Sequence, residues 1–495
     1  MQLHTIDWII ALLSVAICFI PALFFGKRSG QSTAEFFASG RSVPWWLAGL
    51  SMVATTFSSD TPNLVANFVR TQGVAGNWQW WAFTLTGVAT VFFYARLWRR
   101  SGVLTDLEFY ELRYSGAAAK AVRGFRAVYL GFFFNCFIMA SVNLAACKIA
   151  AILFGFDRWQ TLLAVGLLNV VFAAHSGLWG VLVIDMFQFF IKMSAVIAAA
   201  YFAVKLPQVG GMSGLVEKLS HVSGPHGLNY LSMLPDFTKD WDLAVAVFIL
   251  PIAVQWWAVW YPGAEPGGGS YIAQRMLASK SEKDALGATL FFNVAHYVLR
   301  PWPWIITGLA SLIVYPQLAD IQKAFPHLDP KLLGHDIAFP AMLRFMPAGW
   351  IGLMLGGLIA ANSSTILTHL NWGACCQFVH HSDAPELGRV LPSARLLPAI
   401  PESRKARQAL RSGWAVVHHP VVLRLLRHGV SAGLRAGQLQ HPAAAGRRHR
   451  PLIPAALVLV AHHGLVRDRR HGGLLRCGDH VPDPAQERHG SAHRA

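Results

Sequence analysis

Nine apolar segments of about 20 residues follow one another along the first three quarters of this chain, and they constrain its fold more than any other feature. A helix needs about that many apolar residues to cross the hydrocarbon core of a bilayer. Short polar stretches separate the segments, which predicts one bundle of membrane-spanning helices rather than a series of soluble domains. The predicted spans are 7–25, 45–67, 78–97, 126–154, 160–175, 177–204, 241–262, 287–314 and 347–374.

The composition agrees with an all-α, polytopic membrane bundle. Hydrophobic residues make up 54% of the 495 residues and charged residues only 14%, with a mean hydropathy of +0.40. These values exclude a soluble globular protein, a disordered chain and a collagen-like chain. The six cysteines lack metal-ligand spacing, and they do not indicate a disulfide-stapled domain.

Basic residues predict how the bundle is oriented in a cell membrane, because lysine and arginine accumulate in cytoplasmic loops. Alternating spans with the amino terminus outside place most of the loop cations inside. We therefore expect a multi-pass protein of the cell membrane with an external amino terminus. The residues placed inside are Lys27, Arg28, Arg41, those of the basic stretch 96–126, Arg275, Lys280 and Lys283.

The second span contains an unusual concentration of polar groups. Five hydroxyls, one carboxylate and Pro62 lie within residues 55–62. Polar groups at membrane depth are costly and commonly line a cavity or pathway. Proline lacks an amide hydrogen and disfavours helical geometry at the preceding residue, so carbonyls upstream lose their partners. Such carbonyls favour a bound cation, although a proline-kinked helix sealed by its neighbours also fits the pattern.

A second hydroxyl cluster occurs in the last span, at 360–371. Ser364, Thr365 and Thr368 lie within about one turn, so their oxygens share one helix face. Neutral oxygens suit a small monovalent ion better than a transition metal. Helical serine and threonine also bond to the carbonyl of the preceding turn, which is the structural alternative. Two such clusters in one bundle favour an ion site between them.

Three stretches resemble the sodium:solute symporter family, and the similarity covers about residues 5–374. The first resembles the first core helix of that family and the third its sodium-binding helix, while the second is less specific. The resemblance implies a LeuT-like bundle of two inverted repeats, five helices plus five, preceded by one extra span. The stretches are GRSVPWW at 40–46 with SMVATTFSSDTP at 51–62, QWW at 255–257 with WYPG at 260–263, and the cluster 360–371.

The resemblance also implies where ion and solute would bind. Matched residue by residue, the sodium ligands would be the carbonyls of Ala54, Phe57 and Ala361 and the hydroxyls of Ser364 and Thr365. The solute would lie beside the ion, between the second span and the span 241–262. We expect Asp60, Gln255 and Trp256 to line that cavity.

Asp185, in the sixth span, resembles an acidic position of the family at which sodium pauses on its way to the cytoplasm. The alternative is a carboxylate solvated near the inner membrane face. Lys192 lies about 10 Å further along the same helix, too far for a direct pair. Gln188 and the long lysine side chain would nevertheless connect the two charges.

These observations predict sodium-coupled symport of a small organic solute by alternating access. Sodium is the expected coupling ion, and no cofactor is expected. An enzyme is not expected, because the sequence shows no nucleophile elbow, metal-protease pair or catalytic carboxylate pair, and no P-loop lysine follows the glycines at 267–269. The alternative is a non-transporting membrane sensor or scaffold that uses the same bundle.

The chain changes character after residue 374, which divides it into a transporter core, 1–374, and a basic tail, 375–495. The tail carries 18 Lys and Arg against 7 Asp and Glu and 13 of the 21 histidines, and it lacks Asn, Thr, Tyr and Met. This composition is typical of a GC-rich gene read in a shifted frame, which would leave the second repeat incomplete. The alternatives are a genuine cytosolic tail, disordered and basic, or an arm that binds anionic lipid or nucleic acid. The residues of that arm would be Arg447, Arg448 and Arg450. Because most of the net charge of +17 comes from this tail, the core gives no indication of nucleic-acid binding.

Overall fold

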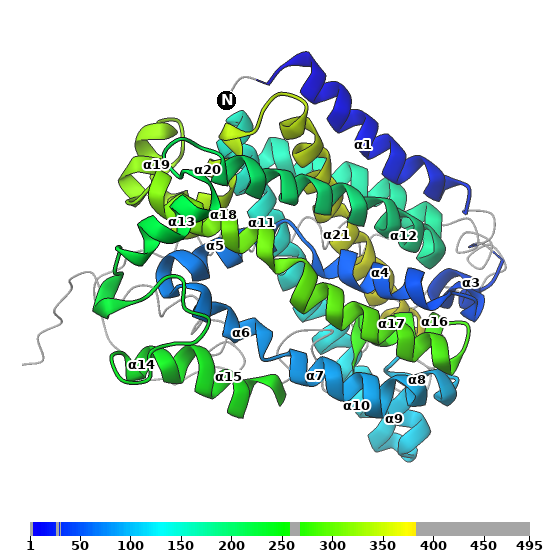
Figure 1. Cartoon of the computed structure of the whole chain (residues 1–495). Coiled ribbons are helices and arrows are strands. Elements are labelled where there is room, and N and C mark those ends of the chain that lie inside the picture. The colour runs from blue at the N-terminus through cyan, green and yellow to red at the C-terminus, as the bar shows by residue number, and fades with distance from the viewer. Residues whose placement is uncertain (1–2, 26–28, 30, 258–267, 383–495) are drawn as a thin grey trace, which may run out of the picture. The chain divides into compact units, whose positions relative to one another are not determined.

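The computed structural model describes residues 3–25, 29, 31–257 and 268–382. Within these ranges the chain is helical, and its extended pairings are two isolated bridges, Val43–Ser279 and Ser223–Asn229 (Figure 1). The predicted all-α bundle is therefore confirmed. The tail predicted from residue 375 onwards lies outside the described residues, apart from the last turns of one helix that ends at Ser382.

The predicted spans coincide with helices throughout the described part, and the end of the predicted span 241–262 lies outside it. In chain order the spans are α1 (Thr5–Leu23), α4 (Trp45–Thr56) with α5 (Asp60–Gln72), α6 (Trp78–Trp81) with α7 (Thr84–Ala89) and α8 (Ala95–Ser101), α10 (Gly116–Val128) with α11 (Asn135–Phe154), both parts of α12 (Arg158–Val204), α14 (Trp241–Ala244) with α15 (Leu250–Ala253), α17 (Glu282–Val294) with α18 (Pro301–Val314), and α21 (Trp350–Ser382). The connecting helices are α3 (Thr33–Ala38), α9 (Glu108–Arg113), α13 (Gly211–Ser220), α16 (Ser270–Ala278), α19 (Leu318–Ala324) and α20 (Ala338–Met342).

Several spans are interrupted. By length and composition, five helical stretches of the described chain can cross a membrane: Thr5–Leu23, Gly116–Phe154, Gly177–Val204, Glu282–Val314 and Trp350–Cys375. The second and third spans are instead divided into shorter helices, and a π-helical segment, Val245–Ile249, joins α14 to α15. Apolar run length therefore located the spans but not their internal breaks.

The long helix α12 contains two predicted spans joined at Gly177. The backbone there has φ 55° and ψ −165°, a non-helical conformation that glycine adopts readily. A Cβ at this position would also lie 2.8 Å from Ser29 Oγ. Both the backbone and the close contact therefore require glycine at the junction between the spans.

Helix α21 lies at the centre of the described helices. It packs most extensively against α12 and α1, and it also contacts α4 and α11 (Figure 1). Its apolar window is 89% buried, whereas that of α1 is 33% buried. A helix that is apolar on all sides belongs in the interior of a bundle, whereas α1 covers its edge.

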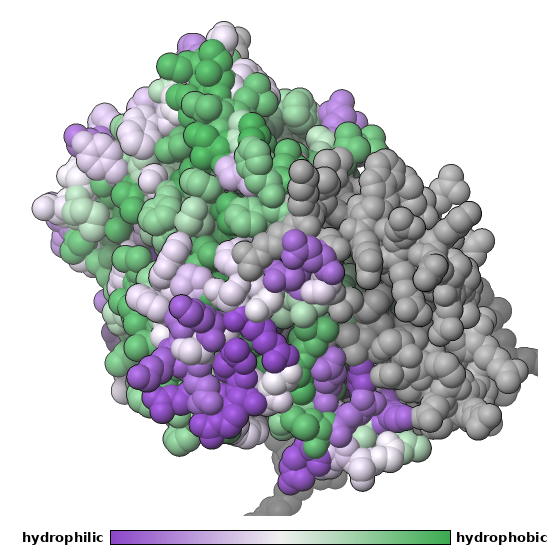
Figure 2. Space-filling view, turned by 90° about the vertical axis from the view of Figure 1, so that its right-hand side faces the viewer, coloured by the Kyte–Doolittle hydropathy of each residue, from purple (hydrophilic) through white to green (hydrophobic). Residues whose placement is uncertain are grey.

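Large apolar side chains are exposed on the outside of the bundle. Phe92 and Phe93 are 72% and 71% exposed, and Leu163 and Leu167 are each 70% exposed. Figure 2 shows one face on which an apolar region and a cluster of hydrophilic residues occupy different ends. This separation is typical of a surface that faces lipid along its length and water at its end.

Loops that the alternation of spans places on the same side do contact one another. Val43 N donates to Ala278 O at 3.1 Å, and both residues belong to loops predicted inside. At the opposite end, the buried Asp7 carboxylate accepts from Gly349 N at 2.6 Å and caps the start of α21. The contacts at both ends of the bundle therefore agree with the predicted alternation of spans.

Candidate ion and solute site

The second span is a broken helix. Helix α4 ends at Thr56 and α5 begins at Asp60, and Phe57 between them has φ −96° and ψ 68°. The predicted interruption is confirmed, but its predicted cause is wrong in detail. Pro62 is the third residue of α5, where an amide hydrogen is not needed for a helical bond. The break therefore lies upstream of the proline, which favours the start of the new helix.

The carbonyls at the end of α4 bind a lysine. Lys192 Nζ, from the second part of α12, donates to Ala54 O at 3.0 Å and to Phe57 O at 3.1 Å. The ammonium also lies 5.4 Å from the centre of the Phe57 ring, and Lys192 is only 2% exposed. Two of the five predicted sodium ligands thus coordinate a positive charge that belongs to the chain itself.

Helix α21 supplies the other side of this junction. Thr365 Oγ1 donates to Thr55 O at 2.8 Å and lies 3.3 Å from Ala361 O. Thr55 and Thr368 share a hydrogen bond of 3.0 Å between their hydroxyls. The two polar clusters therefore meet across the interior of the bundle, as we expected from the sequence.

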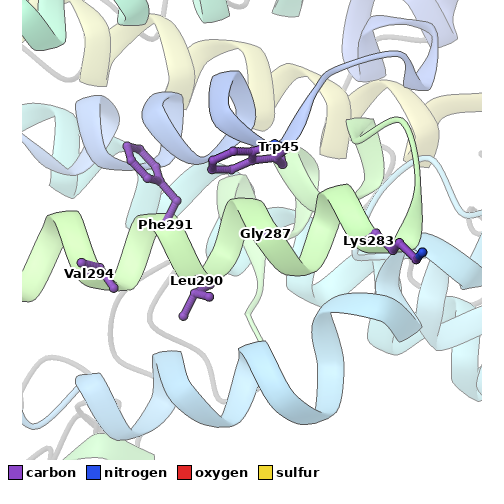
Figure 3. A pocket seen from close by; sticks show the side chains of 6 residues that line it. All are labelled: Trp45, Lys283, Gly287, Leu290, Phe291 and Val294. Atoms are coloured by element: carbon purple, nitrogen blue, oxygen red, sulfur yellow. The ribbon is translucent and has the colours of Figure 1, made fainter.

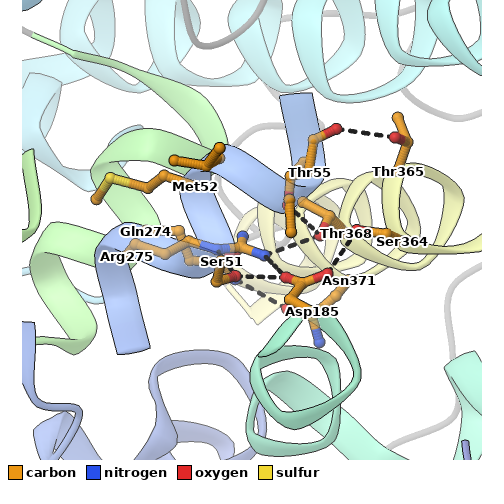
Figure 4. Close-up of polar contacts among 12 residues, drawn as sticks. Ser51, Met52, Thr55, Asp185, Gln274, Arg275, Ser364, Thr365, Thr368 and Asn371 are labelled. Atoms are coloured by element: carbon orange, nitrogen blue, oxygen red, sulfur yellow. Dashed lines mark hydrogen bonds and ion pairs between the residues drawn. The ribbon is translucent and has the colours of Figure 1, made fainter. Parts of the chain in front are cut away.

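A buried ionic network adjoins the same junction. Asp185 accepts from Ser51 Oγ and from Ser364 Oγ, each at 2.5 Å. Arg275 Nη2 lies 3.8 Å from Asp185 and donates to Thr368 Oγ1 at 2.8 Å. Figure 4 shows these side chains pointing toward one another from α4, α12, α16 and α21. Hydroxyls, a carboxylate and a guanidinium thus satisfy one another.

The network corrects three expectations. Asp185 is completely buried, so the alternative of a carboxylate solvated near the inner face is wrong. Arg275 is buried in α16 rather than placed in a cytoplasmic loop, because its nine-residue helix packs into the bundle. Gln188 does not connect Lys192 to Asp185, since both of its amide atoms lack a hydrogen-bond partner in the described part of the chain.

The three predicted solute-cavity residues lie in two places. Asp60, partly buried at the start of α5, accepts a hydrogen bond from Ser58. Gln255 donates to Gln79 O at 3.2 Å, and Trp256 O accepts from Thr86 Oγ1 at 2.5 Å. No hydrogen bond joins Asp60 to Gln255 or Trp256 within the residues described, and the chain that follows Trp257 lies outside them. Their role in binding solute stays a prediction.

Arg300 tethers α18 to the broken span. It donates to Thr56 Oγ1 at 3.1 Å, and its guanidinium lies over the rings of Phe57 and Trp304 at 5.8 and 5.2 Å. These contacts hold the non-helical residue Phe57 and its neighbour Thr56 against the start of α18. The arginine therefore stabilises the break that positions the carbonyls.

A cavity of about 460 Å³ lies away from this junction, along α17 and the start of α4 (Figure 3). Its walls include Leu290 and Val294, which are 48% and 53% exposed, and Trp45, which is 46% exposed. Such a groove belongs to the surface that faces lipid, and it contains none of the predicted site residues. We do not assign the solute to it.

The sequence singled out Lys192 and Arg275 but predicted the wrong surroundings for both side chains. A signal was present for Lys192, because its charge lies within a strongly apolar stretch of its helix, whereas Arg275 lies in a short helix with polar neighbours. An ionisable residue in such a setting usually pairs with another group in the bundle interior. The sequence did not identify the partners of Lys192 and Arg275, because their contacts join residues more than 90 positions apart.

A broken helix that crosses a hydroxyl-lined helix inside a membrane bundle is the architecture of a secondary transporter. Comparison with solved structures supports this fold. The chain resembles a Na+-coupled sialic acid symporter in a substrate-bound, outward-open state, with a TM-score of 0.65, 18% identity, and coverage of 88% of this chain and 82% of that one. At this identity the likeness shows the fold, which is LeuT-like.

The chain belongs to the sodium:solute symporter family, whose sequence profile matches residues 36–380. A sodium/glucose cotransporter from Vibrio parahaemolyticus is 25% identical over 382 residues, which are 74% of this chain and 67% of that protein. Sodium/glucose cotransporter 4 from Mus musculus is 22% identical, over 74% of this chain and 54% of its own length. A sodium/mannose cotransporter from Bos taurus is also 22% identical, over 75% and 62%.

The chain thus spans between about half and two thirds of the length of these relatives. Family membership identifies it as a multi-pass membrane protein of a transporter family rather than an enzyme. Symporters of this family are proteins of the plasma membrane, in agreement with the predicted location.

Proposed function

We propose that the protein moves a small organic solute across the membrane together with sodium, by alternating access. The observation that carries the proposal is the contact between the broken α4 and the hydroxyl face of α21, where Thr365 Oγ1 meets Thr55 O at 2.8 Å. Sodium would bind at this crossing, with Ala54, Phe57, Ala361, Ser364 and Thr365 as its ligands. Asp185, one hydrogen bond away from Ser364, would guide the ion toward the cytoplasm.

We also propose two inverted repeats after the peripheral helix α1, the second one incomplete in this chain. The first repeat would begin with the broken span α4–α5 and the second with the interrupted span that contains α14 and α15. Interrupted helices at corresponding positions of two halves are a strong pointer to a transport site. The solute would bind between them, near Asp60, Gln255 and Trp256.

The names of the relatives indicate which solutes to test. The relatives reported above are named for glucose, mannose and sialic acid, so sugars and sugar acids are the first solutes to test. A membrane potential of about 100 mV contributes about 2.3 kcal/mol for each charge moved, which is sufficient to accumulate a neutral solute more than about tenfold per sodium ion.

The test is uptake of radiolabelled glucose, mannose and sialic acid by proteoliposomes under an inward sodium gradient. We expect uptake of one of these solutes, and we expect Ser364→Ala and Thr365→Ala to lower it at subsaturating sodium, because each removes one oxygen from the crossing. Thr71→Ala serves as the control, since this hydroxyl bonds to the preceding turn of α5 at Asn67 O. Equal uptake when choline replaces sodium would contradict sodium coupling, and solute binding without flux would favour a sensor.

A further inference from the structure

Lys192 occupies the position that the proposed function assigns to sodium. Its ammonium is bound by Ala54 O and Phe57 O at 3.0 and 3.1 Å, and it approaches them from α12, which flanks both α4 and α21. An alkali ion and an ammonium group both bind carbonyl oxygens, because both are compact and positively charged. Ala54 O and Phe57 O therefore cannot bind sodium while they bind the Lys192 ammonium in this geometry.

The charges around the junction are already positive in sum. Two carboxylates lie near the crossing in the described structure. Asp185 lies 3.8 Å from Arg275 and on the same helix as Lys192, and Asp60, at the start of α5, interacts electrostatically with Arg300. Arg300, whose guanidinium lies 5.8 Å from the centre of the Phe57 ring, is the third cation, so three positive charges stand against two negative ones. Water screens these charges little, because four of the side chains are at most 2% exposed: Asp185, Arg275, Lys192 and Arg300. A sodium ion added beside Lys192 would meet repulsion rather than a surplus of negative charge.

The helix also offers the lysine another acceptor. Gln188 precedes Lys192 by four residues and therefore lies on the same face of α12. It is completely buried, and both of its amide atoms are without a hydrogen-bond partner among the described residues. A buried amide without partners is unfavourable, so Gln188 Oε1 provides a place to which a displaced ammonium would move.

We propose that Lys192 is an internal cation of this site, which sodium must displace from the Ala54 and Phe57 carbonyls in order to bind. This inference rests on the proposed sodium site, and it adds a residue that sets the affinity for the ion. A tethered ammonium has no diffusional freedom to lose on binding, so it competes effectively with sodium from solution. Neutralising the lysine should therefore strengthen sodium binding.

The experiment compares Lys192→Met and Lys192→Gln with the unchanged chain, purified in detergent at one fixed pH. Sodium chloride is titrated at constant ionic strength against choline chloride, and the readouts are the thermal unfolding midpoint and binding of radioactive sodium. We expect the sodium concentration for half-maximal stabilisation to fall by at least about tenfold in Lys192→Met, because a like charge has left the site. Lys192→Gln keeps a donor for the carbonyls and protects the fold, and we expect a smaller decrease.

The matched control is Lys205→Met, which removes the same charge from an exposed position at the end of the same helix. Its sodium dependence should equal that of the unchanged chain. If Lys192→Met and Lys192→Gln bind sodium no more tightly than Lys205→Met, Lys192 is not a competitor and the inference fails. If the unchanged chain ignores sodium while Lys192→Met responds to it, sodium-coupled transport fails and the inference stands.

Discussion

Asp185 pairs with the buried Arg275 and lies on the same helix as the buried Lys192. Two serine hydroxyls satisfy its remaining lone pairs. Removing one partner from a buried ion pair costs about 3–5 kcal/mol, because the remaining charge is left without compensation in a medium of low polarity. The carboxylate is therefore required for the stability of the fold, in addition to the role in sodium passage that we propose for it.

Replacing Asp185 by Asn tests this requirement. We expect the variant to unfold at a clearly lower temperature in detergent, with a loss of about 3–5 kcal/mol, since Arg275 keeps its charge and loses its partner. Asp242→Asn, on an exposed residue of α14, is the control and should change the midpoint little. Adding Arg275→Gln to Asp185→Asn should recover part of the loss. Equal midpoints for Asp185→Asn and the control would show that the pair does not stabilise the bundle.

At the level of helices, the geometry of the site depends more on the two breaks in the helices than on their regular turns. The break after Thr56 turns two carbonyls toward α12, and the break at Gly177 lets one continuous element, α12, supply two spans of different direction. Backbone groups at membrane depth have no water to bind, so each break persists only where side chains satisfy it. Lys192 fulfils this role by donating to Phe57 O, Arg300 by donating to Val53 O and Thr61 by donating to Thr56 O.

Gly177→Ala tests the second break. We expect a loss of about 1–3 kcal/mol, because alanine strains a backbone at φ 55° and ψ −165°, and its Cβ would also approach Ser29 Oγ. Gly166→Ala is the matched control on the same element. No atom lies within 4 Å of the Cβ position there, and alanine favours a helix by up to about 1 kcal/mol. Thermal unfolding of the two variants should therefore shift in opposite directions, and a shift of the same sign would contradict the assigned geometry.

On the scale of the whole molecule, orientation follows from the distribution of charge, and the contacts between loops agree with the alternation. The family match reaches residue 380 and α21 reaches Ser382. Core-like sequence thus continues about one to two turns past the boundary proposed at residue 374. We still propose a separate origin for the basic segment beyond it, on composition alone, and the change of reading frame would then fall after residue 380.

Orientation is tested by labelling single cysteines in a chain whose six native cysteines have been replaced. Lys239→Cys lies in the loop predicted outside and Lys280→Cys in a loop predicted inside, and both positions are exposed. In intact cells, an impermeant maleimide should label the first variant at once and the second only after permeabilisation. The reverse pattern would overturn the predicted orientation.

The sequence by itself determined the spans, the broken second helix and the two polar clusters. It could do so because hydrocarbon tolerates few polar groups, so each exception is visible in one dimension. Only the tertiary structure decided that Lys192 donates to the carbonyls at the end of α4 and that Arg275 pairs with Asp185. Those contacts join residues 138 and 90 positions apart, and the direction of a long side chain depends on which helices surround it. Local pattern places a charge on a helix, whereas packing between helices selects the group that neutralises it.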